Sequence, residues 1–206
     1  MKLYFVRHGE SVANLLREFS NSGVKHPLTE RGVEQARRLA QQLAGIPFEG
    51  IYSSPVLRAQ QTAQIVADQV QVPVEVTEAL REWNVGIYEG TTDPEGWRLH
   101  RQVQDDWFFK HAPESKMPGG ENLNEIRARF EPFIEGLIRT HGNTGRNLLC
   151  VAHGGLYTAM LPVIFKNIDH VFADERGIPH TTPCLAELRA DGLYCTSWFG
   201  SPIEPY

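Results

Sequence analysis

The sequence predicts an α/β protein whose mainly parallel sheet is covered by helices. Short apolar, β-rich runs at residues 3–6, 51–53 and 72–76 alternate with segments in which apolar residues recur at helical spacing. This alternation is typical of parallel strands joined by helices. The chain closes differently, because the β-rich runs 185–188 and 193–198 are joined through Asp191-Gly192 and predict an antiparallel hairpin.

The first half of the chain gives these elements recognisable ends. After the strand Leu3–Val6, a loop rich in Ser, Asn and Gly covers about residues 20–27, and Thr29 is the expected N-cap of the first helix. Its inward positions are Val33, Ala36, Leu39, Ala40 and Leu43, and Gly45 with Pro47 ends it. For the next helix we expect Ser54 as N-cap and Pro55 as first residue. Its apolar face is predicted to contain Leu57, Ile65, Val66 and Val70.

The second half begins with an irregular segment and then regains its pattern. Residues 81–120 hold three of the four tryptophans and predict a partly helical cap inserted into a single domain over residues 1–206. An amphipathic helix follows over residues 122–140, with Asn122 and Glu125 as a capping pair. Its expected inward residues are Leu123, Ile126, Phe130, Phe133, Leu137 and Ile138. The strand Leu148–Ala152 then turns at Gly154-Gly155 into a helix that runs to about Phe165.

Composition excludes several classes of protein. The net charge of −5 gives no general attraction to nucleic acid or to anionic lipid, so any anion site must be built locally. No apolar run is long enough for a membrane span or a signal peptide, and we expect a cytoplasmic protein. The three cysteines, Cys150, Cys184 and Cys195, show no tight spacing and are expected to be buried thiols rather than a disulfide framework.

Residues able to bind an anion follow three of the predicted strands. The first strand leads into Arg7-His8-Gly9-Glu10-Ser11 with Asn14, the second into Ser53-Ser54-Pro55 with Arg58 in the next helix, and the last parallel strand into His153-Gly154-Gly155. Ligands of open α/β sheets bind beyond the carboxyl ends of the strands. Helix N-termini and arginine side chains both favour phosphate there. Two arginines and two histidines are therefore expected around one small, doubly charged anion.

These segments together resemble the histidine phosphatase superfamily, and more closely its branch of cofactor-dependent phosphoglycerate mutases and related phosphatases. The matching pieces are Arg7-His8-Gly9-Glu10-Ser11 with Asn14, Ser53-Ser54-Pro55 with Arg58 and Thr62, Glu82 with Gly86 and Glu89-Gly90, Pro118-Gly119-Gly120-Glu121, and Ala152-His153-Gly154. The resemblance implies a three-layer α/β/α sandwich and a phosphohistidine mechanism with no metal and no cofactor.

The resemblance also implies a role for each matching residue. His8 would be the nucleophile, Glu82 the proton donor to the leaving group, and Arg7, Arg58 and His153 the phosphate pocket. Asn14, Ser11 and the backbone N–H of Gly154 would give further substrate-binding groups.

The chemistry of the residues agrees with these roles. A neutral His8 can attack phosphorus through one nitrogen if the other is held as a donor, and a sharp turn at Gly9 would let a backbone carbonyl hold it. Glu82 precedes Trp83, so burial among aromatic residues is expected to raise its pKa. Two other readings stay open: a surface Glu82 paired with Arg81, and Glu10 or Glu121 as the acid.

We therefore expect hydrolysis of a small phosphomonoester, and three alternatives are weighed against it. A mutase is disfavoured because Val85 and Thr91-Thr92-Asp93 stand where mutases carry a Tyr and a Lys. A catalytically silent phosphate-binding module is disfavoured because neither His8 nor Glu82 is replaced. A metal hydrolase is disfavoured because the motif His-Glu-x-x-His is absent. The expected partner is a small phosphorylated metabolite, with no nucleic acid and no membrane, and a homodimer is left open.

The cap is expected to select the substrate. Candidate contacts are Arg17, His26, Arg98, His100, Arg101, Lys110 and His111, although solvated surface charge is the simpler expectation for most of them. Trp97, Trp107 and Phe108 are expected to pack the cap.

Overall fold

The computed structural model describes residues 1–23 and 25–204. Val24 of the expected loop and the last two residues of the expected 1–206 domain lie outside the described residues. Within that range one sheet has the strand order β3-β2-β4-β1-β5-β6-β7. The strands are β1 (Lys2–Arg7), β2 (Phe48–Ser53), β3 (Val74–Val76), β4 (Asn147–Ala152), β5 (Pro183–Arg189), β6 (Gly192–Trp198) and β7 (Ser201–Pro202).

The sheet joins a parallel half to an antiparallel half. Strands β3, β2, β4 and β1 pair in parallel, in the part of the chain where strands and helices alternate. The predicted hairpin of β5 and β6 pairs antiparallel and attaches to β1, and β7 extends it. The parallel strands therefore all end at one edge of the sheet.

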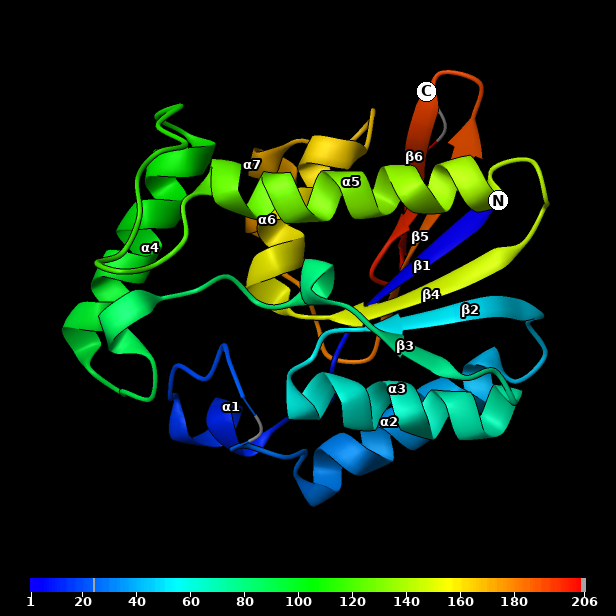
Figure 1. The fold of residues 1–206 in the computed structure, drawn as a ribbon, viewed down its shortest axis with the longest axis horizontal. Coiled ribbons are helices and arrows are strands. Elements are labelled where there is room, and N and C mark those ends of the chain that lie inside the picture. Colours follow the sequence, from blue (N-terminus) through cyan, green and yellow to red (C-terminus); the bar gives the residue numbers. More distant parts are fainter. Residues whose placement is uncertain (24, 205–206) are drawn as a thin grey trace.

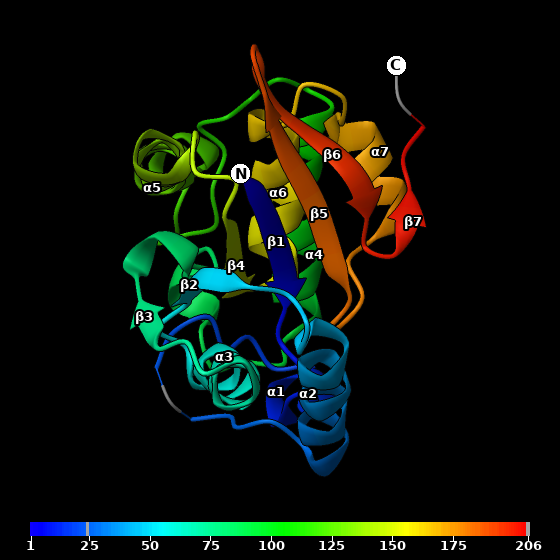
Figure 2. The same cartoon turned by 90° about the vertical axis from the view of Figure 1, so that its right-hand side faces the viewer.

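Helices cover both faces of the sheet, as the predicted sandwich requires. They are α1 (Val12–Leu16), α2 (Glu30–Leu43), α3 (Leu57–Val70), α4 (Pro94–Phe108), α5 (Leu123–His141), α6 (Gly154–Ile164) and α7 (His170–Arg176), with short 3₁₀ turns η1 (Glu78–Leu80) and η2 (Gly86–Tyr88). Helices α2 and α3 lie on one face, and α5 and α6 lie on the other (Figures 1 and 2). The three-layer α/β/α prediction is confirmed.

The two central strands hold the layers together because their side chains alternate between the faces. Leu3 and Phe5 of β1 pack in the core under α5 and α6, while Tyr4 and Val6 pack in the core over α2 and α3. Strand β4 does the same with consecutive apolar residues from Leu148 to Ala152. An uninterrupted apolar run is what a strand buried on both faces needs.

The cap segment lies beyond the carboxyl ends of the parallel strands. Figure 1 shows α1 and α4 at this end of the sheet, with the long helix α5 returning across its face. Trp107 and Phe108 of α4 are buried in the core beneath α5 and α6, so they pack the cap as predicted. Within the described residues, no helix combines the length and apolar character that crossing a membrane requires.

Several local predictions were wrong. Helix α3 begins at Leu57 after the N-cap Val56, two residues later than expected, and the Ser54 hydroxyl accepts from the Val56 N–H at 3.2 Å. Its buried stripe consists of Arg58 and small residues rather than large apolar ones, and of the predicted face only Val66 is fully buried. In α5 Ile134 is buried although it was not predicted, and Phe133 and Ile138 are half-buried and pack against the core. The short helices α1 and α7 were not predicted.

The N-terminus of α5 gives a test of the predicted capping pair. The Asn122 side chain accepts from the Glu125 N–H at 2.9 Å, and the Glu125 carboxylate accepts from the Asn122 N–H at 2.8 Å. We expect Asn122→Ala to lower the free energy of unfolding by about 1 kcal/mol, because one helix N–H loses its acceptor. Denaturant unfolding measures this. Asn124→Ala on the exposed face of the same turn is the control, and equal losses in both variants would contradict the capping role.

Candidate active site

The parallel pairing of β1 and β4 brings the two predicted histidines together. His8 follows β1 directly, and its N–H extends the ladder by donating to the Ala152 carbonyl at 3.0 Å. His153 follows Ala152, and the centroids of the two imidazole rings lie 5.1 Å apart. Both side chains are buried. The predicted meeting of these distant residues is therefore observed.

The contacts of His8 fix its tautomer. Its Nδ1 lies 2.7 Å from the Gly9 carbonyl oxygen, so Nδ1 carries the hydrogen and donates it, as the turn at Gly9 predicted. Its Nε2 accepts from the Arg58 Nε–H at 2.9 Å. Burial, and then the charges of Arg58, His153 and Arg7, hold the pKa of His8 well below its ordinary value. The imidazole is neutral at pH 7, with its lone pair on Nε2.

The loop after His8 is held by close backbone packing. A Cβ atom on Gly9 would lie 2.5 Å from the Gly32 carbonyl oxygen, so this approach of the loop to α2 requires glycine. The Gly9 N–H donates to the Thr62 hydroxyl at 3.1 Å. On the other side, the His8 carbonyl lies 2.7 Å from Nδ1 of His180, which therefore donates.

Arg58 connects both histidines from the first turn of α3. Its Nη1 donates to the Ser20 carbonyl at 2.6 Å, and its Nη2 lies 3.3 Å from Nδ1 of His153. Because an arginine only donates, Nδ1 of His153 accepts, and its Nε2 donates to the Ser54 hydroxyl at 2.7 Å. Burial lowers the pKa of Arg58 to about 10, so it stays charged at pH 7.

His153 itself is neutral in this arrangement. Burial, followed by the charges of Arg58 and Arg7, holds its pKa well below the ordinary value. A bound anion would be needed to stabilise a protonated His153.

Arg7 lies on the opposite side of His8, beside the start of α6. Its Nη1 donates to the Ile178 carbonyl at 2.8 Å, and its buried Nε has no hydrogen-bond partner among the described residues. A Cβ atom on Gly154 would lie 3.3 Å from this Nε. Glycine at this position therefore lets the guanidinium approach the N-terminus of α6, where free N–H groups and the helix dipole favour an anion.

Glu82 is buried and reaches the same helix start. Its carboxylate accepts from the Trp83 N–H at 3.0 Å and from the Gly155 N–H at 2.9 Å. Burial is the largest influence on its pKa and raises it, against those two hydrogen bonds and the charge of Arg58. A Cβ atom on Gly155 would lie 2.9 Å from both carboxylate oxygens, so glycine makes room for this side chain.

The rival carboxylates have other partners. Glu121 lies 3.0 Å from Arg81 and 3.1 Å from Arg129, and hydrogen bonds and charge from Arg129 hold its pKa below the ordinary value. Glu10 accepts from the Thr29 hydroxyl at 2.9 Å. Neither borders the cavity, and Arg81 pairs with Glu121 rather than with a surface-exposed Glu82.

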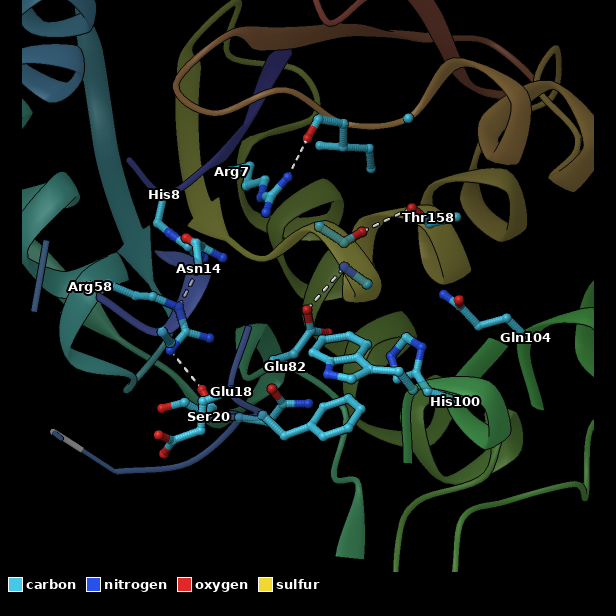
Figure 3. A pocket seen from close by; sticks show the side chains of 18 of the residues that line it. Arg7, His8, Asn14, Glu18, Ser20, Arg58, Glu82, His100, Gln104 and Thr158 are labelled. Atoms are coloured by element: carbon cyan, nitrogen blue, oxygen red, sulfur yellow. Dashed lines mark hydrogen bonds between the residues drawn. The ribbon is translucent and has the colours of Figure 1, made fainter. Parts of the chain in front are cut away.

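These groups surround one cavity of about 330 Å³. Figure 3 shows Arg7, His8, Asn14, Arg58 and Glu82 around it. Gly154 also borders it, whereas His153 lies behind Arg58. Ser11, predicted to bind substrate, lies outside the cavity lining, and its N–H and hydroxyl both donate to the Asn14 amide oxygen. Ser11 thereby orients Asn14.

A family model for the histidine phosphatase superfamily, branch 1, matches residues 3–200. The chain belongs to this superfamily. A phosphoglycerate mutase of Gloeobacter violaceus, described as dependent on 2,3-bisphosphoglycerate, is 30% identical over 199 residues, which cover 93% of this chain and 88% of the relative. A candidate phosphoserine phosphatase of Hydrogenobacter thermophilus is 32% identical over 181 residues, covering 86% and 87% of the two chains.

The fold of this histidine phosphatase superfamily member also matches a solved structure. A mycobacterial glucosyl-3-phosphoglycerate phosphatase superposes with a TM-score of 0.82 at 24% identity, over 97% of this chain and 99% of the other. At this identity the likeness concerns the fold.

Most of the candidate cap contacts of this superfamily member point elsewhere. Of the seven residues proposed, only His100 borders the cavity. Three of the others form ion pairs, Arg98 with Glu95, Arg101 with Asp174 and Lys110 with Asp106, and His26 contacts Glu18 through its Nε2. Arg17 borders a neighbouring hollow beside Trp97, and His111 is exposed. Solvated surface charge, the simpler expectation, describes most of this set.

Other residues at the site were missed by sequence reasoning. Ser54 holds His153, His180 holds the His8 backbone, and the Ser20 carbonyl holds Arg58. Ser54 was predicted as a helix cap within the segment Ser53-Ser54-Pro55, without the role of holding His153. The other two lie in loops without periodicity, and no local pattern marks a carbonyl that will accept from a distant side chain.

The buried neutral histidines predict how stability depends on pH. The pKa values of His8, His153 and His100 are all lowered from 6.5, that of His100 to about 4, so the unfolded chain takes up protons that the folded chain does not. We expect the free energy of unfolding to fall as the pH drops from 6.5 towards 5. The slope approaches about 1.4 kcal/mol per pH unit for each such histidine.

Urea unfolding at several pH values measures this dependence. His100→Gln is the matched variant. Its unfolding free energy should change less steeply with pH, because the contribution of one histidine is removed. An unfolding free energy that stays constant between pH 7 and pH 5 would contradict the neutral, buried state of these side chains.

Proposed function

We propose that this protein is a phosphatase that hydrolyses a small phosphomonoester through a phosphohistidine on His8. The observation that carries the proposal is the state of His8: a buried neutral imidazole whose Nδ1–H is held by Gly9 and whose Nε2 carries the lone pair. Arg7, Arg58 and the N-terminus of α6 supply positive charge around the same cavity.

In the first step, the Nε2 lone pair of His8 forms a bond to phosphorus while the bond from phosphorus to the ester oxygen breaks. Arg58, whose Nε donates to Nε2 in the structure, transfers that hydrogen bond to a phosphate oxygen. Glu82 gives its proton to the leaving oxygen, and its raised pKa favours the protonated form that this step needs.

In the second step, water attacks the phosphohistidine. The Glu82 carboxylate takes a proton from that water, the N–P bond breaks, and the electron pair returns to His8 Nε2. Inorganic phosphate leaves, and both side chains regain their starting states. Negative charge is spread over the equatorial oxygens in both transition states, and the two fixed guanidinium groups stabilise it in a site shielded from solvent.

A mutase is the second candidate, and the name of the Gloeobacter relative favours it. A phosphoglycerate mutase must bind a second acidic group of its substrate and protect the phosphoenzyme from water. Within the described residues, Arg7 and Arg58 are the only arginine or lysine side chains that border the cavity, and both face the first phosphate. Hydrolysis is therefore better supported than mutase activity. Hydrolysis that needs no bisphosphorylated primer would distinguish the phosphatase from the mutase.

Replacement of the nucleophile is the most direct test. His8→Asn should abolish turnover of p-nitrophenyl phosphate and the acid-labile phosphoenzyme together, because both require Nε2. Radiolabelled phosphate retained after a rapid quench measures the second quantity. His111→Asn, at an exposed position, is the matched control and should retain both.

The same assay tests the need for a metal ion. The charge at the site is supplied by arginine side chains, so activity should persist in excess chelator. Loss of activity there, or normal turnover by His8→Asn, would contradict the mechanism.

Glu82 is tested through the leaving group. Glu82→Gln should slow esters of alkyl alcohols by about 10²–10⁴-fold and p-nitrophenyl phosphate much less, because only the poor leaving group needs a proton. In the unmodified enzyme, kcat for an alkyl ester should fall as the pH rises through the raised pKa of Glu82, where the donor loses its proton.

That basic limb should vanish in Glu82→Gln. Glu10→Gln keeps the acidic residue at the site and is the control. Equal slowing of both ester classes in Glu82→Gln would assign the proton transfer to another group.

A further inference from the structure

The outer half of the cavity has a composition that the phosphate chemistry does not explain. Beyond the phosphate-binding residues, its wall contains Glu18, Asp174, Gln104, His100 and the aromatic residues Phe19 and Trp97. Figure 3 shows His100 and Gln104 opposite His8 and Arg58. A substrate whose phosphate lies against His8 must place its alcohol in this outer half.

The two carboxylates of the wall are already engaged. Asp174 accepts from Arg101 Nη1 at 2.7 Å and Nη2 at 2.8 Å. Glu18 lies 2.9 Å from Nε2 of His26 and also contacts Lys25. Glu18 and Asp174 border the cavity, whereas their cationic partners Lys25 and Arg101 lie outside the cavity lining.

The remaining polar groups of the wall are uncharged. Burial lowers the pKa of His100 to about 4, and its ring stacks on Trp83 at 4.4 Å, so it is a neutral imidazole at pH 7. Gln104 is half-buried on α4 and borders the cavity. The amide and the neutral imidazole can each donate and accept hydrogen bonds, and the carboxylates can accept them. Together these groups suit a ligand that carries hydroxyl groups.

The aromatic side chains give the wall a flat apolar surface. Trp97 stacks on Phe19 with ring centroids 3.9 Å apart, and both lie 5.5 Å from the His100 ring. Such a surface packs well against the C–H face of a ring or a carbon chain.

We infer that the alcohol of the natural substrate is uncharged and bears hydroxyl groups, and that esters carrying a carboxylate on the alcohol are discriminated against. This inference rests on the proposed phosphatase function and specifies its substrate class. A carboxylate in the outer half would approach Glu18 and Asp174, and among the described residues no arginine or lysine other than Arg7 and Arg58 borders the cavity. Like charges at close range oppose binding. Hydroxyl groups would instead donate to those oxygens.

A matched pair of esters tests the inference. Glycerol 3-phosphate and 3-phosphoglycerate differ only by a CH₂OH group in place of a carboxylate. We expect kcat/KM to be at least about tenfold higher for glycerol 3-phosphate, since one unfavourable charge contact of about 1.4 kcal/mol has this effect. Raising the salt concentration should reduce the ratio.

Substitutions at Gln104 should change the ratio of kcat/KM for glycerol 3-phosphate to kcat/KM for 3-phosphoglycerate in both directions. Gln104→Lys places a cation in the outer half and should lower the preference for glycerol 3-phosphate, whereas Gln104→Glu should increase it. Gln102→Lys is the matched control: it makes the same charge change two residues away on the exposed side of α4, outside the cavity lining, and should leave the ratio unchanged.

Hydrolysis of p-nitrophenyl phosphate distinguishes failure of the substrate inference from failure of the proposed phosphatase function. If it proceeds through the phosphoenzyme while 3-phosphoglycerate is cleaved as well as glycerol 3-phosphate, the substrate inference is overturned and the phosphatase function stands. The inference is also overturned if Gln104→Lys and Gln102→Lys change the ratio equally. If neither turnover of p-nitrophenyl phosphate nor a phosphoenzyme is found, the proposed phosphatase function is itself contradicted, and the substrate inference falls with it.

Discussion

The pairing of β1 with β4 is the constraint on which the site depends. The in-register pairs from Lys2 with Asn147 to Arg7 with Ala152 make both strands end at the same level, so that His8 and His153 leave the sheet side by side. The core on both faces fixes that register, since a one-residue slip would turn every buried side chain of β1 towards the wrong layer. Catalytic geometry is thus a consequence of core packing.

The second constraint is electrostatic, because two guanidinium groups and two imidazoles are buried within a few ångströms of one another. Among the described residues, no carboxylate is in direct contact with either arginine: backbone carbonyls of Ser20 and Ile178 accept from Arg58 and Arg7, and the histidines stay neutral. Carbonyl partners leave the positive charge uncompensated. The resulting potential is what a dianionic phosphate requires, and maintaining it lowers the stability of the folded state.

The parts of the site that could be predicted from sequence are those encoded locally. An apolar strand followed by Arg-His-Gly or His-Gly-Gly places its own residues at a sheet edge, and the order of elements then brings His8, Arg58 and His153 together. Ser54 and His180 could not be predicted in this way, because their roles depend on where chains from other elements pass. The buried face of α3 was mispredicted for a related reason: close packing against α2 and the sheet favours small residues there, and hydrophobic periodicity alone selects large ones.

Chemistry and specificity are built from different parts of the chain. The proposed phosphate-binding residues come from strand ends and helix starts, which the sheet holds rigidly, whereas the outer wall comes mostly from α4, from α7 and from the loop around Glu18 and Phe19. Trp83 links the two parts, because its backbone N–H binds the Glu82 carboxylate while its ring stacks on His100. A change in the wall can therefore alter which alcohol is accepted while the groups around His8 keep their positions, which gives a physical reason why relatives with one fold can carry the names of different phosphate esters.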